Sequence, residues 1–106
     1  MTVSQLINNL NSFHGMPAYE NEPHCSDSQK TYFITDIAFF ENNCFVFYQY
    51  PANKYYQSVR SLVADLRTYS HQQNYQVEFV NYNTNETFFN CNFHAVHGYN
   101  LTLRLY

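Results

Sequence analysis

Charged residues make up only 12% of this 106-residue chain, which also has no tryptophan and only two glycines. The five Lys and Arg residues are scattered, so no basic patch can neutralise a run of phosphates. The eight Asp and Glu residues are too few to imitate a nucleic-acid backbone. Gly15 and Gly98 cannot build a phosphate-binding Gly-rich loop, and no apolar run reaches the roughly 18 residues of a membrane span. We therefore expect neither duplex nucleic acid nor a membrane as a partner.

Cysteine is also scarce, which bears on the redox environment. Cys25, Cys44 and Cys91 cannot all pair, and the opening MTVSQLINNLN has no basic segment followed by an apolar signal core. These features predict a cytoplasmic protein with reduced thiols. The length predicts one domain over residues 1–106, because single cores extend to about 100 to 150 residues. A domain of this size is expected to fold without a cofactor.

Two segments have apolar residues at helical spacing. The first helix is expected over residues 3–13, with Thr2 and Gln5 in capping-box positions and Gly15 as the terminator. The second follows Asn53 as its expected cap. Its apolar stripe would consist of Tyr55, Val59, Leu62, Val63, Leu66 and Tyr69. Between the two helices, residues 16–30 contain two prolines and no period, which predicts a long loop.

The segments 31–40 and 44–50 are rich in aromatic and β-branched residues and predict a hairpin that turns at Asn42 and Asn43. Strict alternation divides the first strand into one face with Phe33, Thr35, Ile37 and Phe39 and another with Tyr32, Ile34, Asp36, Ala38 and Phe40. In the second strand, alternation opposes Phe45 and Phe47 to Cys44, Val46, Tyr48 and Tyr50. Both faces are largely apolar, so we expect helices to cover one and a partner chain to cover the other.

The last third of the chain predicts a meander of strands at 75–82, 87–97 and 100–106. The fold class is therefore α+β, a single domain in the order αββαβββ. We expect a mainly antiparallel sheet with two helices packed on one of its faces.

The sequence CNFHAVHG, residues 91–98, has the spacing of metal ligands at Cys91, His94 and His97. In a strand, however, Cys91 and His97 would lie about 20 Å apart and His94 would point to the opposite face. We therefore expect Cys91, Phe93 and Ala95 to face the core, Asn92 and His94 to face outward, and His97 to lie at a turn. A small zinc domain that adds His24 and Cys25 to these ligands remains the alternative function.

No grouping in the sequence matches a catalytic motif. Cys25 adjoins His24, but neighbouring side chains seldom bring a thiol and an imidazole into hydrogen-bonding geometry. An enzyme that acts through Cys25 is therefore a third hypothesis, and the main prediction is a protein that is not an enzyme and needs no cofactor.

Phe and Tyr together supply 20% of the residues, and this is the positive functional signal. Aromatic residues dominate protein-binding hot spots. We expect a protein partner, or a second copy of this chain in a homodimer, to bind a sheet face through Tyr32, Tyr48, Tyr50 and His94. The alternative is that the tyrosines replace other apolar residues at the margins of the core.

The opening MTVSQLINNLN, with a Leu-Ile-x-x-Leu helix that leads through a loop into strands, resembles the start of many small proteins encoded by phages and plasmids. The resemblance covers about a dozen residues and assigns no functional residue. It implies an inhibitor or adaptor that works by contact, including an inhibitor of a host defence enzyme.

Overall fold

The computed structural model describes residues 1–68, 71 and 73–106 of the chain as one compact α+β unit. The helices are α1 (Val3–Asn11), the 3₁₀ helix η1 (Pro17–Glu20) and α2 (Val59–Leu66). The strands are β1 (His24–Ser26), β2 (Thr31–Phe40), β3 (Asn43–Gln49), β4 (Gln76–Asn81), β5 (Thr87–Phe88), β6 (Cys91–Val96) and β7 (Asn100–Leu105). None of the described helices is long and apolar enough to cross a membrane.

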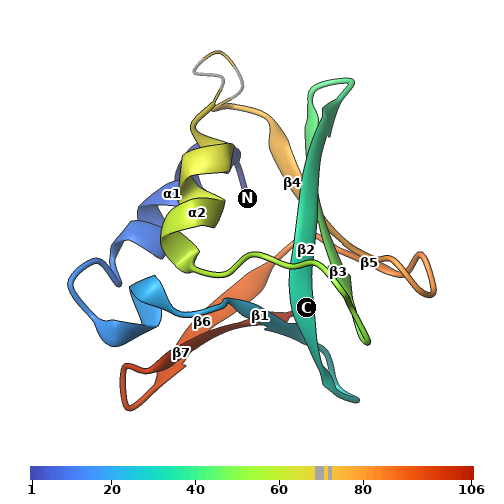
Figure 1. Ribbon diagram of the computed structural model, residues 1–106. Helices are drawn as coiled ribbons and strands as arrows, with labels where there is room; N and C mark the ends of the chain where they lie inside the picture. The colour runs from blue at the N-terminus through green and yellow to red at the C-terminus, as the bar shows by residue number, and fades with distance from the viewer. Residues whose placement is uncertain (69–70, 72) are drawn as a thin grey trace.

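The strands form one mixed sheet in the order β5-β4-β3-β2-β1-β7-β6. The pairs β1–β7 and β3–β4 are parallel, and the other pairs are antiparallel. Only Phe89 and Asn90 separate β5 from β6, although these strands are at opposite ends of the strand order. The sheet therefore curls until its two ends approach each other, and α1 and α2 lie inside the curl (Figure 1).

This architecture confirms the α+β class and the two helices, and it matches the predicted order and the mainly antiparallel character in part, because two of the strand pairs are parallel and further elements are present. Residues 16–30 contain η1 and β1, and β1 pairs in parallel with β7 through Cys25 and Leu103. The strand expected at 87–97 is divided, because Phe88 pairs with Phe79 of β4 whereas Cys91 pairs with Leu105 of β7. Short parallel pairings between distant segments have no local sequence signal.

Helix α1 follows the prediction closely. The Thr2 side chain accepts a hydrogen bond from Gln5 N–H at 3.2 Å, and the Gln5 side chain accepts one from Thr2 N–H at 2.8 Å. This capping box satisfies donors that the first helical turn leaves free. The helix ends at Asn11, and Gly15 lies in the turn that follows, with φ +89°. The apolar face is buried at Val3, Leu6, Ile7 and Leu10.

Helix α2 begins later than expected, so the assignment of Asn53 as its cap is wrong. The cap is Ser58, whose hydroxyl accepts a hydrogen bond from Ser61 N–H at 3.0 Å. Before it, Tyr56 N–H donates to Ile34 C=O of β2 at 2.9 Å, which holds this segment extended. Tyr55 is therefore not part of the helical stripe, whereas Val59, Leu62, Val63 and Leu66 are buried on it. The predicted stripe residue Tyr69 lies outside the described residues.

The β2–β3 hairpin agrees with the predicted alternation in β3 but not along the whole of β2. Cys44, Val46 and Tyr48 are buried beneath the helices, and Phe45 and Phe47 lie on the other face. In β2 the register shifts between Ile34 and Asp36, so Ile37 pairs with Val46 and packs against the core. The prediction that Ile34 and Ala38 share a face is therefore wrong, because a β-bulge inserts one residue between them.

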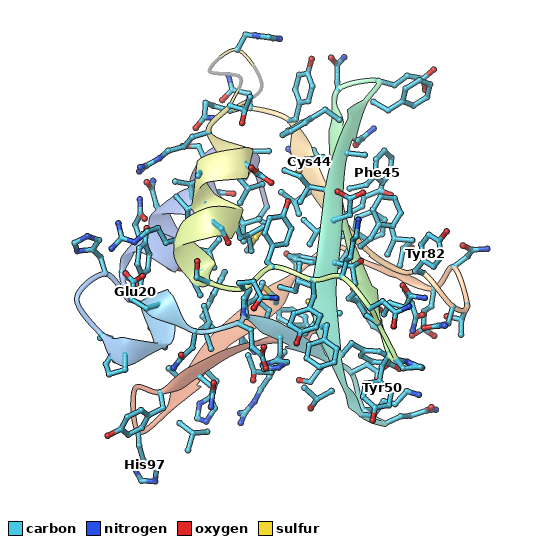
Figure 2. The ribbon with its side chains drawn as sticks, viewed as in Figure 1. Glu20, Cys44, Phe45, Tyr50, Tyr82 and His97 are labelled. Carbon is cyan, nitrogen blue, oxygen red and sulfur yellow. The ribbon has the colours of Figure 1, made fainter. Side chains whose placement is uncertain are left out.

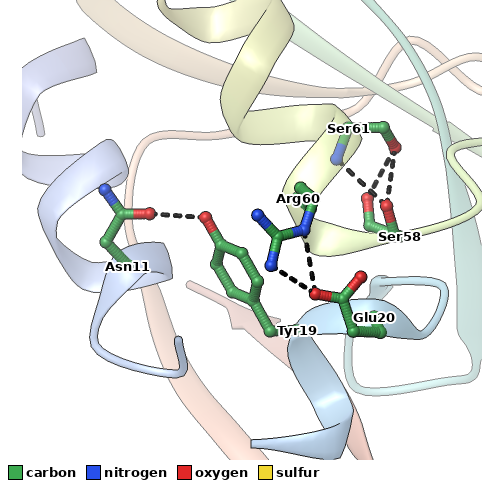
Figure 3. A network of polar contacts seen from close by, with 6 residues as sticks. All are labelled: Asn11, Tyr19, Glu20, Ser58, Arg60 and Ser61. Atoms are coloured by element: carbon green, nitrogen blue, oxygen red, sulfur yellow. Dashed lines mark hydrogen bonds and ion pairs between the residues drawn. The ribbon is translucent and has the colours of Figure 1, made fainter. Parts of the chain in front are cut away.

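Polar contacts hold η1 against both helices (Figure 3). The Tyr19 hydroxyl donates to Asn11 Oδ1 at 2.7 Å, which joins η1 to α1. The Arg60 guanidinium of α2 donates to Glu20 Oε1 at 2.9 and 2.6 Å and lies 5.0 Å from the Tyr19 ring centroid. The hydrogen bond from Arg60 holds the pKa of Glu20 below its usual value. These contacts give the predicted loop a fixed path.

Candidate protein-binding surface

The four residues predicted to bind a partner are not on one surface. Tyr32 and Tyr48 are 4% and 0% exposed, so the expected exposure of these two side chains is wrong. Tyr32 precedes the bulge of β2, and Tyr48 of β3 pairs with Ile34 just before it. Both side chains point to the inner face of the sheet, where the helices cover them. Tyr50 is 50% exposed, beyond the end of β3. His94 is half-buried on β6, at the other end of the strand order.

The two buried tyrosines differ in their hydrogen bonding. Their rings meet edge to face with centroids 5.0 Å apart. The Tyr32 hydroxyl donates to Asp27 Oδ2 at 2.9 Å, whereas the buried Tyr48 hydroxyl has no hydrogen-bond partner within the described part of the chain. Burial raises the pKa of Tyr48 well above its usual value. Tyr48 is therefore part of the core, and burial of its hydroxyl without a hydrogen bond lowers the stability of the fold.

Asp27 is the polar partner that fixes Tyr32. Its carboxylate accepts hydrogen bonds from Gln29 N–H and Lys30 N–H at 2.8 and 3.0 Å as well as from Tyr32. Burial favours the neutral acid, but these three hydrogen bonds outweigh it and hold the pKa of Asp27 below its usual value. The cluster orders the turn between β1 and β2.

The outer face of β2 and β3 bears a set of aromatic side chains that extends into the neighbouring loops. We define the outer aromatic patch as Phe33, Phe45, Phe47, Tyr50, Tyr55 and Tyr82. Figure 2 shows Phe45 and Tyr82 on the side of the sheet away from the helices, whereas Cys44 points toward them. Sequence reasoning did not identify Tyr55 or Tyr82 as surface residues. For Tyr82, the alternation of buried Val77 and Phe79 was an available signal.

Ring contacts organise the patch into two groups. Phe33 stacks on Tyr55 with centroids 4.2 Å apart and an interplanar angle of 17°, and Tyr50 is nearly parallel to Phe33 at 6.2 Å. Phe47 lies 6.4 Å from Phe45 and meets Tyr82 edge to face at 6.3 Å. Such pairs contribute about 0.5 to 1.5 kcal/mol each beyond the area they bury. The rings therefore hold one another in place before any ligand arrives.

A groove of about 740 Å³ lies at the edge of the patch. Its lining includes the aromatic residues Phe47 and Tyr82 and the segment Pro51–Lys54. Asp36 and Lys54 place one charge of each sign beside it. A groove with aromatic sides and a few polar groups has the general character of a ligand-binding site.

The three cysteines are all free and buried. Burial raises the pKa of Cys44 and of Cys91 to about 12, and it raises the pKa of Cys25 well above its usual value. Since the thiolate is the nucleophile and the metal ligand, burial disfavours the reactive form of all three cysteines. His24 is half-buried on the outer face, and burial lowers its pKa, which the nearby Glu22 carboxylate opposes.

The residues of the alternative zinc-binding function do not converge. Cys91 is buried, Asn92 is exposed, and His97 is exposed in the β6–β7 turn with φ 51°, as predicted. His24 and His94 flank Thr102 on the outer face, about 10 Å apart at two strand spacings, whereas Cys25 and Cys91 face the core. Within residues 1–68, 71 and 73–106, no group of three or more His, Cys, Asp or Glu side chains could hold a metal ion.

A second groove, of about 460 Å³, separates β2 from α2. The Tyr56 hydroxyl donates to Asp65 Oδ2 at 2.7 Å beside it. Burial, and then the hydrogen bond to Asp65, raise the pKa of Tyr56 well above its usual value. Tyr56 is therefore a hydrogen-bond donor that ties the segment before α2 to the helix.

No protein-family model matches this chain, and no curated protein or solved structure matches it. The function is therefore argued from the geometry of the outer aromatic patch.

Proposed function

We propose that this chain is a non-catalytic domain that binds another protein through the outer aromatic patch. The main support is the position of the patch: its rings lie on the sheet face that neither described helix covers, and they contact one another in two groups. Stiff aromatic side chains lose little conformational entropy on binding and supply large contact areas. The proposed binding residues therefore include Phe47 and Tyr82 in place of the buried Tyr32 and Tyr48, and they keep Tyr50.

A purely structural role explains the patch less well. Cross-strand aromatic pairs stabilise sheets, and the half-buried Phe33, Phe45 and Phe47 fit that role. Tyr50 and Tyr82 are 50% and 63% exposed, so half or more of each residue's surface is not buried by the fold. Exposed aromatic side chains gathered on one face are typical of an interaction site.

The biological role of this binding, as an inhibitor or an adaptor, is a prediction from the sequence. The resemblance of MTVSQLINNLN to small phage- and plasmid-encoded proteins favours an inhibitor of a host defence enzyme, or an adaptor. The three unpaired cysteines favour the cytoplasm as the compartment. We expect the activity to require no cofactor.

The test compares two pairs of exposed tyrosines. Tyr50→Ser/Tyr82→Ser alters the patch, and Tyr99→Ser/Tyr106→Ser is the matched control, since Tyr99 and Tyr106 are 60% and 63% exposed outside it. Each variant and the wild type are immobilised, and proteins captured from a lysate are quantified by mass spectrometry. A protein retained by the wild type and the control but lost from the patch variant supports the proposal. Equal capture by all three chains contradicts it.

A further inference from the structure

The two end strands of the sheet differ in how their free edges are protected. At one end, β5 has only two residues. The part of β4 that β5 leaves uncovered pairs with the N-terminus, since Val77 N–H donates to Met1 C=O at 2.8 Å and Thr2 forms a bridge with Gln76. Short end strands and covered edges prevent other chains from adding to a sheet. This end of the sheet is closed to strand addition.

At the other end, the N-terminal ammonium lies only at the start of β6, where it donates to Phe89 C=O at 3.4 Å, and β6 is neither short nor charged along its edge. It is a six-residue strand with the sequence CNFHAV, which contains no Pro, Lys or other charged residue apart from the titratable His94. Its register with β7 runs from Cys91–Leu105 to Val96–Asn100 without a bulge. No strand of the described chain lies beyond it. A regular, uncharged end strand is a template for pairing with another strand.

The alternation of hydrogen bonds between β6 and β7 determines which backbone groups of β6 point to its free edge. Asn90 and Tyr106 exchange both backbone hydrogen bonds, at 3.3 and 3.0 Å. Because antiparallel ladders alternate, Asn92, His94 and Val96 then bond to β7, whereas Cys91, Phe93 and Ala95 direct their N–H groups away from it. No turn, loop or cap hydrogen bond of the described residues involves the backbone of Phe93. These outward groups are centred on Phe93.

We propose that β6 pairs with β6 of a second copy of this chain, antiparallel and with Phe93 opposite Phe93 on the two-fold axis. In this register Cys91 faces Ala95 of the other copy, so a small side chain meets a small one on the inner face. On the outer face Asn92 faces His94 in both halves of the pair, which allows a side-chain hydrogen bond in each. No pair places two formal like charges opposite each other.

The pairing continues each sheet into the other and leaves the outer aromatic patch free. The patch lies on β2, β3 and the loops beside them, with β1 and β7 between it and β6. The dimer therefore presents two copies of the patch to a partner, which raises apparent affinity for a repeated target. A six-residue edge buries less than the roughly 800 Å² per partner of stable interfaces, so the dimer should depend on concentration. The inference does not depend on the function proposed for the patch.

The decisive variants change only the outer-face pair. In the Asn92→Asp/His94→Asp variant, the carboxylate at position 92 of each copy faces the carboxylate at position 94 of the other. In the Asn92→Asp/His94→Lys variant, a carboxylate faces an ammonium group at both of these places. Both contain the same Asp beside Arg104, its neighbour on β7, so contacts within one chain are matched at that position. Sedimentation equilibrium should show a dimer of the wild type that is weakened about tenfold or more in the Asp/Asp variant and restored in the Asp/Lys variant.

A second measurement does not require any substitution. Hydrogen exchange of the wild type should slow at the Phe93 amide as concentration rises, while the His94 amide, already bonded to β7, is unaffected. A wild-type chain that remains monomeric up to about 1 mM, with no change at Phe93, overturns the proposal. A dimer that responds identically to the two double variants also overturns it, because its interface is then elsewhere.

Discussion

Tyr32 and Tyr48 form a matched pair whose hydroxyls should have opposite effects on stability. Both rings are buried and contact each other with centroids 5.0 Å apart, so removal of either hydroxyl leaves the packing nearly the same. Only the Tyr32 hydroxyl has a partner, the Asp27 carboxylate at 2.9 Å, among the described residues. A buried hydroxyl without a partner costs about 1 to 3 kcal/mol, whereas a hydrogen bond to a charged group contributes about 1.5 to 3 kcal/mol. We therefore predict that Tyr48→Phe stabilises the protein and Tyr32→Phe destabilises it.

The magnitudes can be measured by urea denaturation. With an m value of about 1.5 kcal/mol/M, a gain of about 1 kcal/mol moves the midpoint of Tyr48→Phe up by about 0.7 M. A loss of about 1.5 kcal/mol moves the midpoint of Tyr32→Phe down by about 1 M. A fall in the midpoint of both variants would refute the reasoning, because the Tyr48 hydroxyl would then make a stabilising hydrogen bond.

Three further predictions concern the polar and thiol groups that hold the fold. Asp27→Asn keeps an acceptor for the turn N–H groups but loses the charge, so the wild type should be the more stable protein at neutral pH. Since the folded pKa of Asp27 is lowered, this difference in free energy of unfolding is complete above the ordinary value of 3.8 and disappears as pH falls below it; a pH-independent difference would be inconsistent. Ser58→Ala removes the cap of α2 and should cost about 1 kcal/mol in thermal unfolding, whereas an unchanged midpoint would mean that the cap is not formed. Thiol titration should find none of the three buried cysteines reactive until the protein is unfolded, and a rapidly modified thiol in the native state would contradict their burial.

Local patterns predicted the elements whose signals are local. The capping box of Thr2 and Gln5 with the apolar spacing of α1, the alternation of β3 and the orientation of β6 all follow from neighbouring residues, and the structure confirms them. The position of His97 at a turn was correct for the same reason. These interactions extend over a few residues, so one sequence is sufficient to detect them.

The elements that were predicted wrongly depend on contacts between distant residues. The bulge after Ile34 shifts the alternation of β2, and it occurs where Tyr56 N–H bonds to Ile34 C=O from a segment more than twenty residues away in the chain. Strand β1 exists through its pairing with β2 and β7, and α2 begins late because the preceding segment is held against β2. The composition indicated exposed aromatic residues, but the face of the sheet that the helices cover depends on distant contacts, and Tyr32 and Tyr48 are buried on that face.

The central claim is that the exposed tyrosines of the outer aromatic patch bind a protein and do little for the fold. The most direct measurement is the affinity of the captured partner for the wild type, for Tyr50→Ser/Tyr82→Ser and for Tyr99→Ser/Tyr106→Ser, by isothermal titration calorimetry. We predict at least about tenfold weaker binding for the patch variant alone, as expected for aromatic hot-spot residues. Equal affinities for all three chains, or equal losses in both variants, would contradict the account.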